Sequence, residues 1–378
     1  MKIAVVAERA DAEARVALVP DLVEKLTQLG YQVVLEPGAG NAANFSDADY
    51  VAVDAAVAAD ALAQADVVLA VQPLRPEQVR MLRSGASVLS FLPTASAHDT
   101  VVDLRDCGVT SFALELVPRI SRAQSMDALS SQSLVSGYRC AVVAAGLLRR
   151  FFPLNMTAAG TVPPAEVVVL GAGVAGLQAI ATCKRLGAVV KGYDVRAAAA
   201  EEIRSMGATA IELDLETLEG AGGYAREMTE DRADRQRSLL APYIAGADAL
   251  ITTAAVPGRS APLLVTREMV AAMRPGSVVV DLAAESGGNV EGSEPGRVVA
   301  VGAAQVWGAR NVPSSMPGPA SRLLAANIVN LVTLMTVDGE FAPDFADEIV
   351  AGSCVTHAGE IVHEPTRALL EPTEESSE

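Results

Sequence analysis

The strongest chemical signal in this chain lies in residues 167–195, VVVLGAGVAGLQAIATCKRLGAVVKGYDV. Gly171, Gly173 and Gly176 stand in G-x-G-x-x-G spacing, after a β-branched run and before a segment of helical apolar periodicity. A second strand-like run ends at Asp194. Strand, glycine turn, helix, strand and acid follow in the order that a dinucleotide site requires. The sequence therefore predicts such a site, and the alternative is a glycine-rich turn in an ordinary βαβ unit.

Each glycine of this motif has a separate task. Gly171 permits the tight turn, Gly173 lets the backbone approach a pyrophosphate, and Gly176 lets the helix lie close to the strand. The helix N-terminus then offers free N–H groups and a positive dipole end to the phosphates. Asp194 would accept hydrogen bonds from ribose hydroxyls and repel a 2′-phosphate, which favours NAD over NADP. Arg196 could soften that preference, but we expect it to be solvated or paired with the next helix.

A second polar-rich stretch is PRISRAQSMDALSSQS, residues 118–133. It follows a predicted strand end at the expected domain junction, where open α/β sheets bind ligands. Gln124 or Ser130 could hold a carboxamide, and Asp127 could fix Arg119 through a charge-assisted hydrogen bond. The alternative is a solvated loop that caps the next helix, with Asp127 as a candidate N-cap.

The N-terminal region is poor in candidate general bases. Between Pro20 and Pro118 the sequence has one lysine, Lys25, and one histidine, His98, and neither is well placed. A dehydrogenase that oxidises an alcohol or an amine must also remove a proton, usually with a histidine or a lysine. Hydride transfer directly between two nicotinamides needs no proton acceptor, so positioning of the two rings is most of the task. The missing base favours that reaction.

Length and patterning predict the architecture. With 378 residues, 51% of them hydrophobic, the chain is long for a single core. Strand-like and helix-like segments alternate in both halves, which predicts an α/β fold of two doubly wound, Rossmann-like domains with parallel sheets. We expect long helices to link them and a cleft to lie between them. The predicted domains are residues 1–130 with 320–378, and residues 131–319.

Charge and cysteine usage exclude several classes of protein. The net charge of −17 argues against binding to nucleic acid or to anionic lipid. No apolar run approaches the roughly 20 residues that span a bilayer, and MKIAVVAE is predicted to be a first strand, not a signal peptide. The four cysteines are scattered, as in a reducing cytosol, and the three histidines form no metal pattern.

Several segments together carry a resemblance to a known family. They are PRISRAQSMDALSSQS, TAAGTVPPAEVVVLGAGVAGLQAIATCKRLGA, YDVRAA, AGGYAREM and PGSVVVDLAAESGGN. The chain resembles the NAD(H)-binding component, domain I, of proton-translocating nicotinamide nucleotide transhydrogenases, from residue 1 to about residue 365. Alanine dehydrogenase is a related family that shares the fold and the start, where ARVALVP around Arg15 is similar.

The resemblance implies residue roles. Arg119, Gln124 and Asp127 would hold the nicotinamide end beside NADP(H) on a partner subunit, and Ser130 would contact the carboxamide. Residues 215–230 are long for an α/β connection and are expected to close as a mobile lid over NAD(H), although a solvated loop remains the alternative. The implied cofactor-binding residues are Gly171, Gly173, Val174, Ala175, Gly176, Asp194, Val195, Arg196, Tyr224, Thr253 and Ala254.

The family likeness also implies partners and location. The expected reaction is hydride transfer from NADH to NADP⁺ on a partner subunit, with proton translocation by a separate membrane subunit. Because the chain stops at residue 378, it resembles the split form with a stand-alone subunit. We expect a homodimer in the cytoplasm that is peripheral to the inner membrane through its partners.

Two other functions stay open from the sequence. Alanine dehydrogenases carry a lysine and a histidine at the substrate, about where this chain has Ala70 and Leu92, so that activity is expected to be lost. A non-catalytic NAD-sensing module would not need the polar groups of residues 118–133. The loop PSSMPGPAS departs from the usual family pattern.

Overall fold

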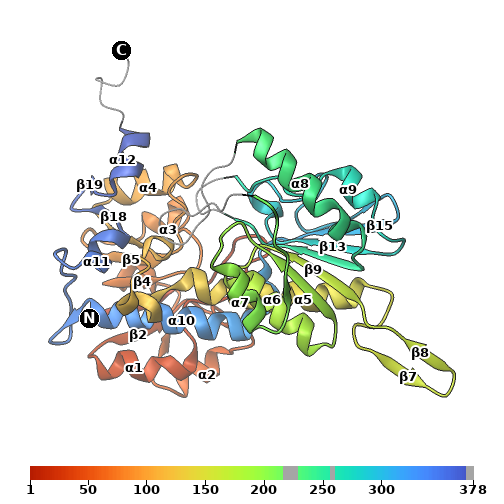
Figure 1. Cartoon of the computed structure of the whole chain (residues 1–378). Helices are drawn as coiled ribbons and strands as arrows, with labels where there is room; N and C mark the ends of the chain where they lie inside the picture. The colour runs from red at the N-terminus through yellow and green to blue at the C-terminus, as the bar shows by residue number, and fades with distance from the viewer. Residues whose placement is uncertain (216–228, 256–259, 372–378) are drawn as a thin grey trace, which may run out of the picture. The chain divides into compact units, whose positions relative to one another are not determined.

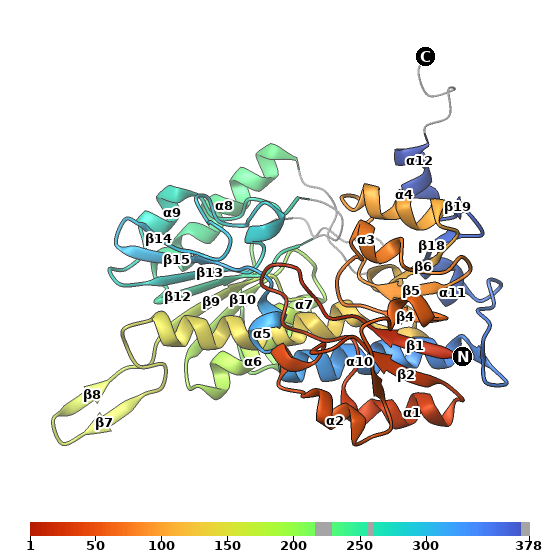
Figure 2. The ribbon, with the colours of Figure 1, turned by 180° about the vertical axis from the view of Figure 1, so that it is seen from behind.

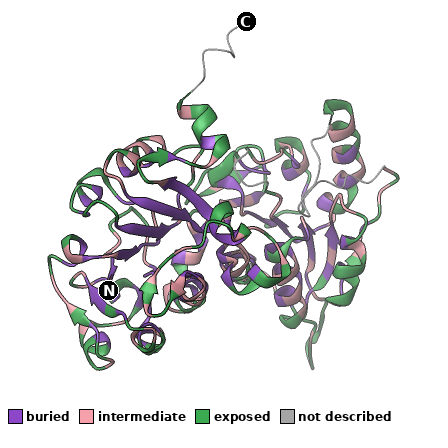
Figure 3. Cartoon of the chain, turned by 90° about the vertical axis from the view of Figure 1, so that its left-hand side faces the viewer, coloured by how far each residue is buried: buried purple, intermediate pink, exposed green. Residues whose placement is uncertain are grey.

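The computed structural model describes residues 1–215, 229–255 and 260–371. The chain forms two compact units (Figure 1): unit 1 is Met1–Gln132 with Pro313–Glu378, and unit 2 is Ser133–Val312. In both units the central strands of the large sheet are buried and much of the outer helix surface is exposed (Figure 3). Within the described ranges, no helix has both the length and the apolar character needed to cross a bilayer.

Unit 1 is built on an eight-stranded sheet of order β19-β18-β6-β5-β4-β1-β2-β3. The strands from β3 to β6 are parallel, and the chain order reverses between β1 and β4. This is the doubly wound arrangement that the sequence predicts, and its switch point lies between the first and fourth strands. The strands are β1 Lys2–Val5, β2 Gln32–Leu35, β3 Ala56–Val57, β4 Val67–Leu69, β5 Ser87–Ser90, β6 Thr110–Ala113, β18 Cys354–His357 and β19 Glu360–Ile361.

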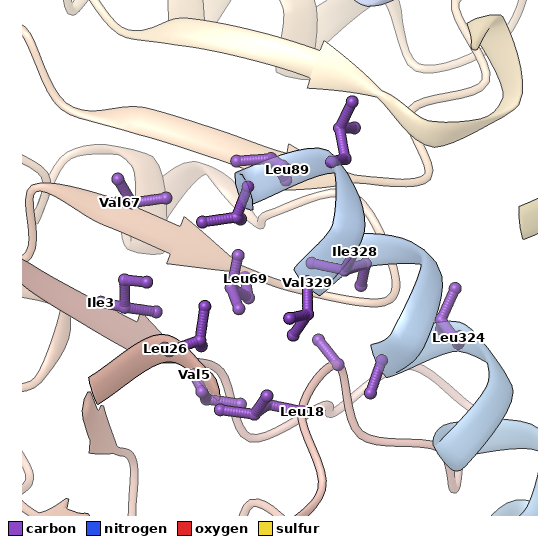
Figure 4. Close-up of a cluster of buried hydrophobic side chains, with 14 of the residues drawn as sticks. Ile3, Val5, Leu18, Leu26, Val67, Leu69, Leu89, Leu324, Ile328 and Val329 are labelled. Carbon is purple, nitrogen blue, oxygen red and sulfur yellow. The ribbon is translucent and has the colours of Figure 1, made fainter. Parts of the chain in front are cut away.

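Both faces of this sheet are covered, because alternate side chains of each strand enter different cores. Figure 4 shows Ile3, Val5 and Leu69 against Ile328 and Val329 of α10. The opposite face buries the intervening residues of the strands against α4. The helices are α1 Val23–Gln28, α2 Asp47–Val51, α3 Pro76–Val79, α4 His98–Asp106, α10 Pro317–Leu334, α11 Glu348–Ser353 and α12 Glu364–Leu370, and the short 3-10 turns are η1 Pro20–Leu22, η2 Asn41–Ala43, η3 Leu62–Gln64, η4 Leu114–Leu116 and η5 Ser121–Met126.

The C-terminal segment adds strands that the sequence pattern does not predict. β18 pairs antiparallel with β6, and β19 pairs with β18. Buried hydroxyls fix this edge, because Ser111 Oγ and Thr356 Oγ1 lie 2.7 Å apart and Thr356 Oγ1 also donates to Val109 O at 2.8 Å. A small antiparallel pair, β16 Thr336–Val337 with β17 Glu340–Phe341, follows α10. Strands this short carry no periodicity of their own.

Unit 2 has a seven-stranded sheet of order β11-β10-β9-β12-β13-β15-β14, parallel except for β14 against β15. Its chain order reverses between β9 and β12. The strands are β9 Glu166–Leu170, β10 Val189–Tyr193, β11 Thr209–Ala210, β12 Ala249–Thr252, β13 Val278–Asp281, β14 Val298–Val301 and β15 Ala304–Gly308. The helices are α5 Ala128–Leu147, which begins in unit 1, α6 Val174–Arg185, α7 Ala199–Ser205, α8 Glu230–Ala245 and α9 Arg267–Ala271, with the 3-10 turn η7 Ala284–Ser286. The 3-10 turn η8 Val312–Ser315 begins at the end of unit 2 and continues into unit 1.

One segment of strand-like composition is longer than the strand that it forms. The run ATAIELD at residues 208–214 has the composition of a full strand, but only the two residues of β11 pair with the sheet. β-branched composition alone does not supply a pairing partner, and an edge strand extends only as far as its neighbour allows.

A hairpin of β7 Asn155–Thr157 and β8 Gly160–Val162 extends away from the rest of unit 2 (Figures 1 and 2). Its side chains Met156 and Val162 are exposed, as are Phe151 and Leu154 before it, and Met156 has 73% of its surface accessible. The sequence pattern does not predict this hairpin.

Candidate functional site

The glycine turn joins β9 to α6 at the switch point of the unit 2 sheet. Gly171 has a φ of +97°, which L side chains rarely adopt. A Cβ on Gly171 would lie 2.7 Å from Thr253 Oγ1, and a Cβ on Gly176 would lie 1.8 Å from Gly171 O. The first and third glycines are therefore required by the backbone itself, as their spacing predicts.

The second glycine is not required by any neighbouring group among the described residues. Gly173 is the N-cap residue of α6, no side chain caps the helix there, and no described atom lies within 4 Å of a Cβ built on it. Val174 is exposed and Ala175 is buried on the first turn of the helix. The N–H groups of this turn have no intrahelical acceptor, so they can bind an anionic group that approaches over Gly173. This geometry suits a pyrophosphate.

Asp194 follows β10 and lies beside the glycine turn. Its carboxylate accepts hydrogen bonds from Ala172 N at 2.7 Å and from Arg196 N at 2.9 Å. Arg196 Nε also donates to it at 2.9 Å, and Arg196 Nη2 donates to Ala172 O at 3.2 Å. The expectation that Arg196 is solvated or pairs with the next helix is therefore wrong. Because Arg196 is only two residues from Asp194, its guanidinium turns back onto the Asp194 carboxylate and partly offsets the negative charge.

An open pocket of about 340 Å³ lies beside Asp194 at the ends of β10 and β11. Val195, Ala197 and Leu213 contribute apolar lining, while Arg196, Arg204 and Arg232 contribute positive charge. Arg204 is paired with Glu212, another lining residue. A mixed apolar and polar pocket next to an acid at this strand end suits the adenosine half of a dinucleotide.

Tyr193 anchors α8 behind this pocket. Its hydroxyl donates to Gln236 Oε1 at 3.2 Å, and both side chains are buried. Burial raises the pKa of Tyr193 to about 12, so the phenol stays protonated and remains a donor. The strand end that carries Asp194 is therefore held by a neutral hydrogen bond.

Thr253 and Ala254 follow β12, on the other side of the switch point. Thr253 Oγ1 donates to Gly171 O at 3.1 Å, so this hydroxyl links the end of β12 to the glycine turn. Asn289 pairs with the backbone of Ala254, accepting from its N–H at 3.0 Å and donating to its carbonyl at 2.8 Å. The residues on both sides of the reversal in chain order are thus tied together.

The buried carboxylate of Asp281 supports this arrangement from the end of β13. It accepts from Thr252 Oγ1 at 3.1 Å and from the backbone N–H groups of Asn289 and Val290. Sequence reasoning missed Asp281 and Asn289 as residues of the site. The available signal was an acid that ends a buried Val run, the same pattern that identified Asp194.

In unit 1 the stretch 118–133 forms η5 and the start of α5. Asp127 accepts from the N–H of Ser130 at 2.8 Å and from its hydroxyl at 2.6 Å. The expected capping alternative for Asp127 is thus present at the first turn of α5. Arg119 and Gln124 are exposed, and the side-chain amide of Gln124 has no hydrogen-bond partner among the described residues.

The turn that carries Gln124 is held from several directions. Ala123 and Met126 are buried in the main core of unit 1. Arg122 makes a two-point ion pair with Asp347, the N-cap of α11, with both N–O distances at 2.8 Å. The guanidinium lowers the pKa of Asp347 to about 2. Gln124 therefore lies on a fixed turn, with its amide exposed and available to a ligand.

The switch point of the unit 1 sheet is filled with charged side chains. The side chain of Glu13 is fully buried and makes a two-point pair with Arg15, at 2.9 and 2.7 Å. Burial opposes ionisation of Glu13, but Arg15 outweighs it and lowers the pKa to about 2. Glu8 accepts from Val71 N at 2.5 Å, and burial raises its pKa to about 7. No G-x-G-x-x-G turn follows β1 here, and the small pocket beside Glu8, lined also by Val6 and Gln72, is about 50 Å³.

Ala70 directly follows β4 and Leu92 lies two residues after β5, and both are buried and apolar. Neither can donate, accept or carry a proton through its side chain. The candidate residue Tyr224 and most of the expected lid at 215–230 fall within residues 216–228, outside the described residues.

The fold and the glycine-turn site together define an α/β protein of the dinucleotide-binding class. Models of the alanine dehydrogenase/PNT N-terminal and C-terminal domains match residues 4–136 and 140–364. The chain belongs to the alanine dehydrogenase/PNT family. This confirms the resemblance and the fold class drawn from the sequence.

Relatives within this family cover nearly the whole chain. NAD(P) transhydrogenase subunit alpha (first part) of Rhodospirillum rubrum is 47% identical over 377 residues, covering 96% of this chain and 98% of the relative. The crystal structure of transhydrogenase from Sinorhizobium meliloti is similar with a TM-score of 0.85 and 41% identity, covering 97% of this chain and 100% of that one. An L-alanine dehydrogenase structure has a TM-score of 0.81 and 26% identity, over 98% and 99% of the two chains.

Proposed function

We propose that this protein is the NAD(H)-binding subunit of a proton-translocating transhydrogenase, which passes hydride from NADH to NADP⁺ on a partner subunit. The observation that carries the proposal is the glycine turn beside Asp194. Described atoms crowd Gly171 and Gly176, whereas the space above Gly173 is free for a pyrophosphate. Similarity to transhydrogenase alpha subunits over almost the whole chain supports the choice within the family. NADH, when bound, supplies the hydride.

The chain's own residues divide the work between its two units. The N–H groups at the start of α6 bind the pyrophosphate, and Asp194 accepts from the adenosine ribose. In unit 1, Gln124 and Arg119 orient the nicotinamide. The Asp127 carboxylate accepts from the hydroxyl of Ser130 and holds that side chain in place until Ser130 contacts the carboxamide. The walls around the pyrophosphate and ribose are shaped by Val174, Ala175, Val195, Thr253 and Ala254.

Direct hydride transfer between two nicotinamides needs no protein base. Ala70 and Leu92, which stand about where alanine dehydrogenases carry a lysine and a histidine, provide none. Alanine dehydrogenase activity is the competing function. The deciding assay measures NADH-dependent reduction of an NADP analogue with and without a purified NADP(H)-binding transhydrogenase subunit, beside an assay with alanine and NAD. Transfer only in the presence of the partner supports the proposal, and alanine oxidation overturns it.

The proposal includes the assembly. A partner subunit binds NADP(H), and a separate membrane subunit couples hydride transfer to proton translocation. This chain then works in the cytoplasm, attached to the inner membrane through those partners. The name of the Rhodospirillum rubrum relative, which is the first part of a subunit alpha, supports an enzyme divided among several chains.

We expect the protein to bind NADH at least about 10-fold more tightly than NADPH. A charge pair about 4 Å apart is worth ~4 kcal/mol at an effective dielectric of about 20, and Arg196 offsets part of the repulsion between Asp194 and a 2′-phosphate. Asp194→Asn keeps an acceptor for Ala172 N and removes the charge that Arg196 now offsets. The NADH to NADPH affinity ratio should then fall toward one, as measured by calorimetric titration.

Asp234→Asn provides the matched control, because Asp234 is an exposed acid of α8 that pairs with Arg237 and does not line the pocket. Its affinity ratio should equal that of the wild type. Equal affinities of the wild-type protein for the two cofactors would contradict the role given to Asp194.

We also propose that the homodimer forms through the β7–β8 hairpin. A two-stranded hairpin is marginally stable by itself, and exposed apolar clusters of this kind mark protein contacts. Met156→Asp should raise the dimer dissociation constant at least about 100-fold, because a symmetric interface contains the substituted residue twice, once from each subunit. Sedimentation over a range of concentrations measures it.

Leu369→Asp is the control for this prediction, since Leu369 is exposed on α12 in the other unit. It should leave the dimer unchanged. A wild-type protein that sediments as a monomer at every concentration would refute the dimer, and a Met156→Asp dimer of normal affinity would refute the role of the hairpin.

A further inference from the structure

The carbonyl group of Ser125, one residue after Gln124, accepts two side-chain hydrogen bonds from α10. Asn327 Nδ2 donates to it at 2.9 Å and Asn330 Nδ2 at 3.0 Å. Ser125 lies at the C-terminal end of η5, where carbonyl groups have no partner within the helix. Two donors from one helix therefore cap another short helix that lies some 200 residues away in sequence.

The orientations of the two amides are determined by their surroundings. Lys25 Nζ donates to Asn330 Oδ1 at 2.8 Å, so the NH₂ group of Asn330 must face Ser125. Asn327 is buried, and its Oδ1 has no hydrogen-bond partner among the described residues. Rotating the Asn327 amide by half a turn would place its oxygen against the carbonyl oxygen of Ser125, which is repulsive. Both side chains therefore act as donors to this carbonyl.

We propose that Asn327 and Asn330 are positioning residues for hydride transfer, which act by fixing the backbone of η5 and thereby the reach of Gln124. This inference rests on the proposed function. The unpartnered buried oxygen of Asn327 is unfavourable, since buried polar atoms are normally hydrogen-bonded. A leucine would fill the same place without an unpartnered oxygen, so the presence of an amide at Asn327 is explained by its hydrogen bond to the Ser125 carbonyl.

The test is a double-mutant cycle on the full chain, assayed with a purified NADP(H)-binding transhydrogenase subunit. One arm is Asn327→Ala with Asn330→Ala, and the other is Gln124→Ala. Loosening η5 by about 1 Å should lower kcat for transfer at least about 10-fold while the Kd for NADH stays within about 2-fold. In the Gln124→Ala background, the asparagine changes should cost less than about 2-fold more, because the group that they position is absent.

A milder variant guards against loss of folding. Asn330→Asp keeps the side-chain volume at a half-buried site but replaces the donor by an acceptor that repels the Ser125 carbonyl, so it should also lower kcat. Thr333→Val is the control, because the Thr333 hydroxyl donates to Val329 O within α10. It should leave kcat unchanged.

The outcomes separate this inference from the proposed function. If Gln124→Ala slows transfer but the asparagine variants do not, or if the two arms are additive, the positioning role is wrong and the proposed function stands. If the wild-type protein shows no transfer with the partner, the proposed function itself is wrong.

Discussion

Gln124→Asn is expected to slow hydride transfer to partner-bound NADP⁺ about 100-fold while the affinity for NADH stays nearly unchanged. The variant keeps the amide but shortens its reach by about one C–C bond, and a displacement of about 1 Å can cost on the order of 100-fold in a reaction that depends on alignment. The turn beneath Gln124 cannot follow the shortened side chain, because Ala123 and Met126 are buried and Arg122 is paired with Asp347. Stopped-flow measurement in the reconstituted complex gives the rate.

The binding half of this prediction follows from the location of the contacts. The glycine turn and Asp194 lie in unit 2 and are unchanged by the variant. A loss of rate without a loss of affinity marks an interaction used in the transition state. Gln28→Asn makes the same change at an exposed site on α1 and should have no effect. Normal transfer by Gln124→Asn would show that Gln124 is an ordinary loop residue.

Gly176→Ala is expected to destabilise the protein by at least about 3 kcal/mol and to abolish tight NADH binding, since overpacking in a fixed core typically costs about 1–3 kcal/mol and sometimes more. The added Cβ would lie 1.8 Å from Gly171 O and 2.9 Å from Thr253 Oγ1, so α6 must move away from the glycine turn. The nearer obstacle is backbone, which cannot rotate aside as a side chain can. Thermal unfolding and calorimetric titration with NADH measure the two effects.

Two glycines of the same unit serve as comparisons. Gly173→Ala meets no described protein atom within 4 Å, so it should leave the unfolding temperature nearly unchanged and weaken NADH binding alone. Gly146→Ala in α5 is also unobstructed and should stabilise by up to about 1 kcal/mol without affecting NADH. An unfolding temperature and NADH affinity of wild-type value in Gly176→Ala would disprove the close approach of α6 to the turn.

Local rules were sufficient for the glycine turn. The requirement for Gly171 and Gly176 is steric and acts within a few residues, and the alternation of buried strands with helices sets the doubly wound order. The same rules failed for Arg196, because its choice between solvent, the next helix and Asp194 depends on where the turn at Ala172 places a carbonyl acceptor. They failed also for the β7–β8 hairpin, whose short strands have no detectable period.

The sequence by itself determined the α/β class, the dinucleotide turn and the acid that follows the second strand, since each depends on a spacing of a few residues. The tertiary structure decided which distant groups support them. Asn289 holds Ala254, Asp281 holds Asn289, and Asn327 holds Ser125. A buried amide or carboxylate satisfies its hydrogen bonds with whichever backbone groups the fold brings near, and those groups can lie far away along the chain. No local pattern encodes that choice.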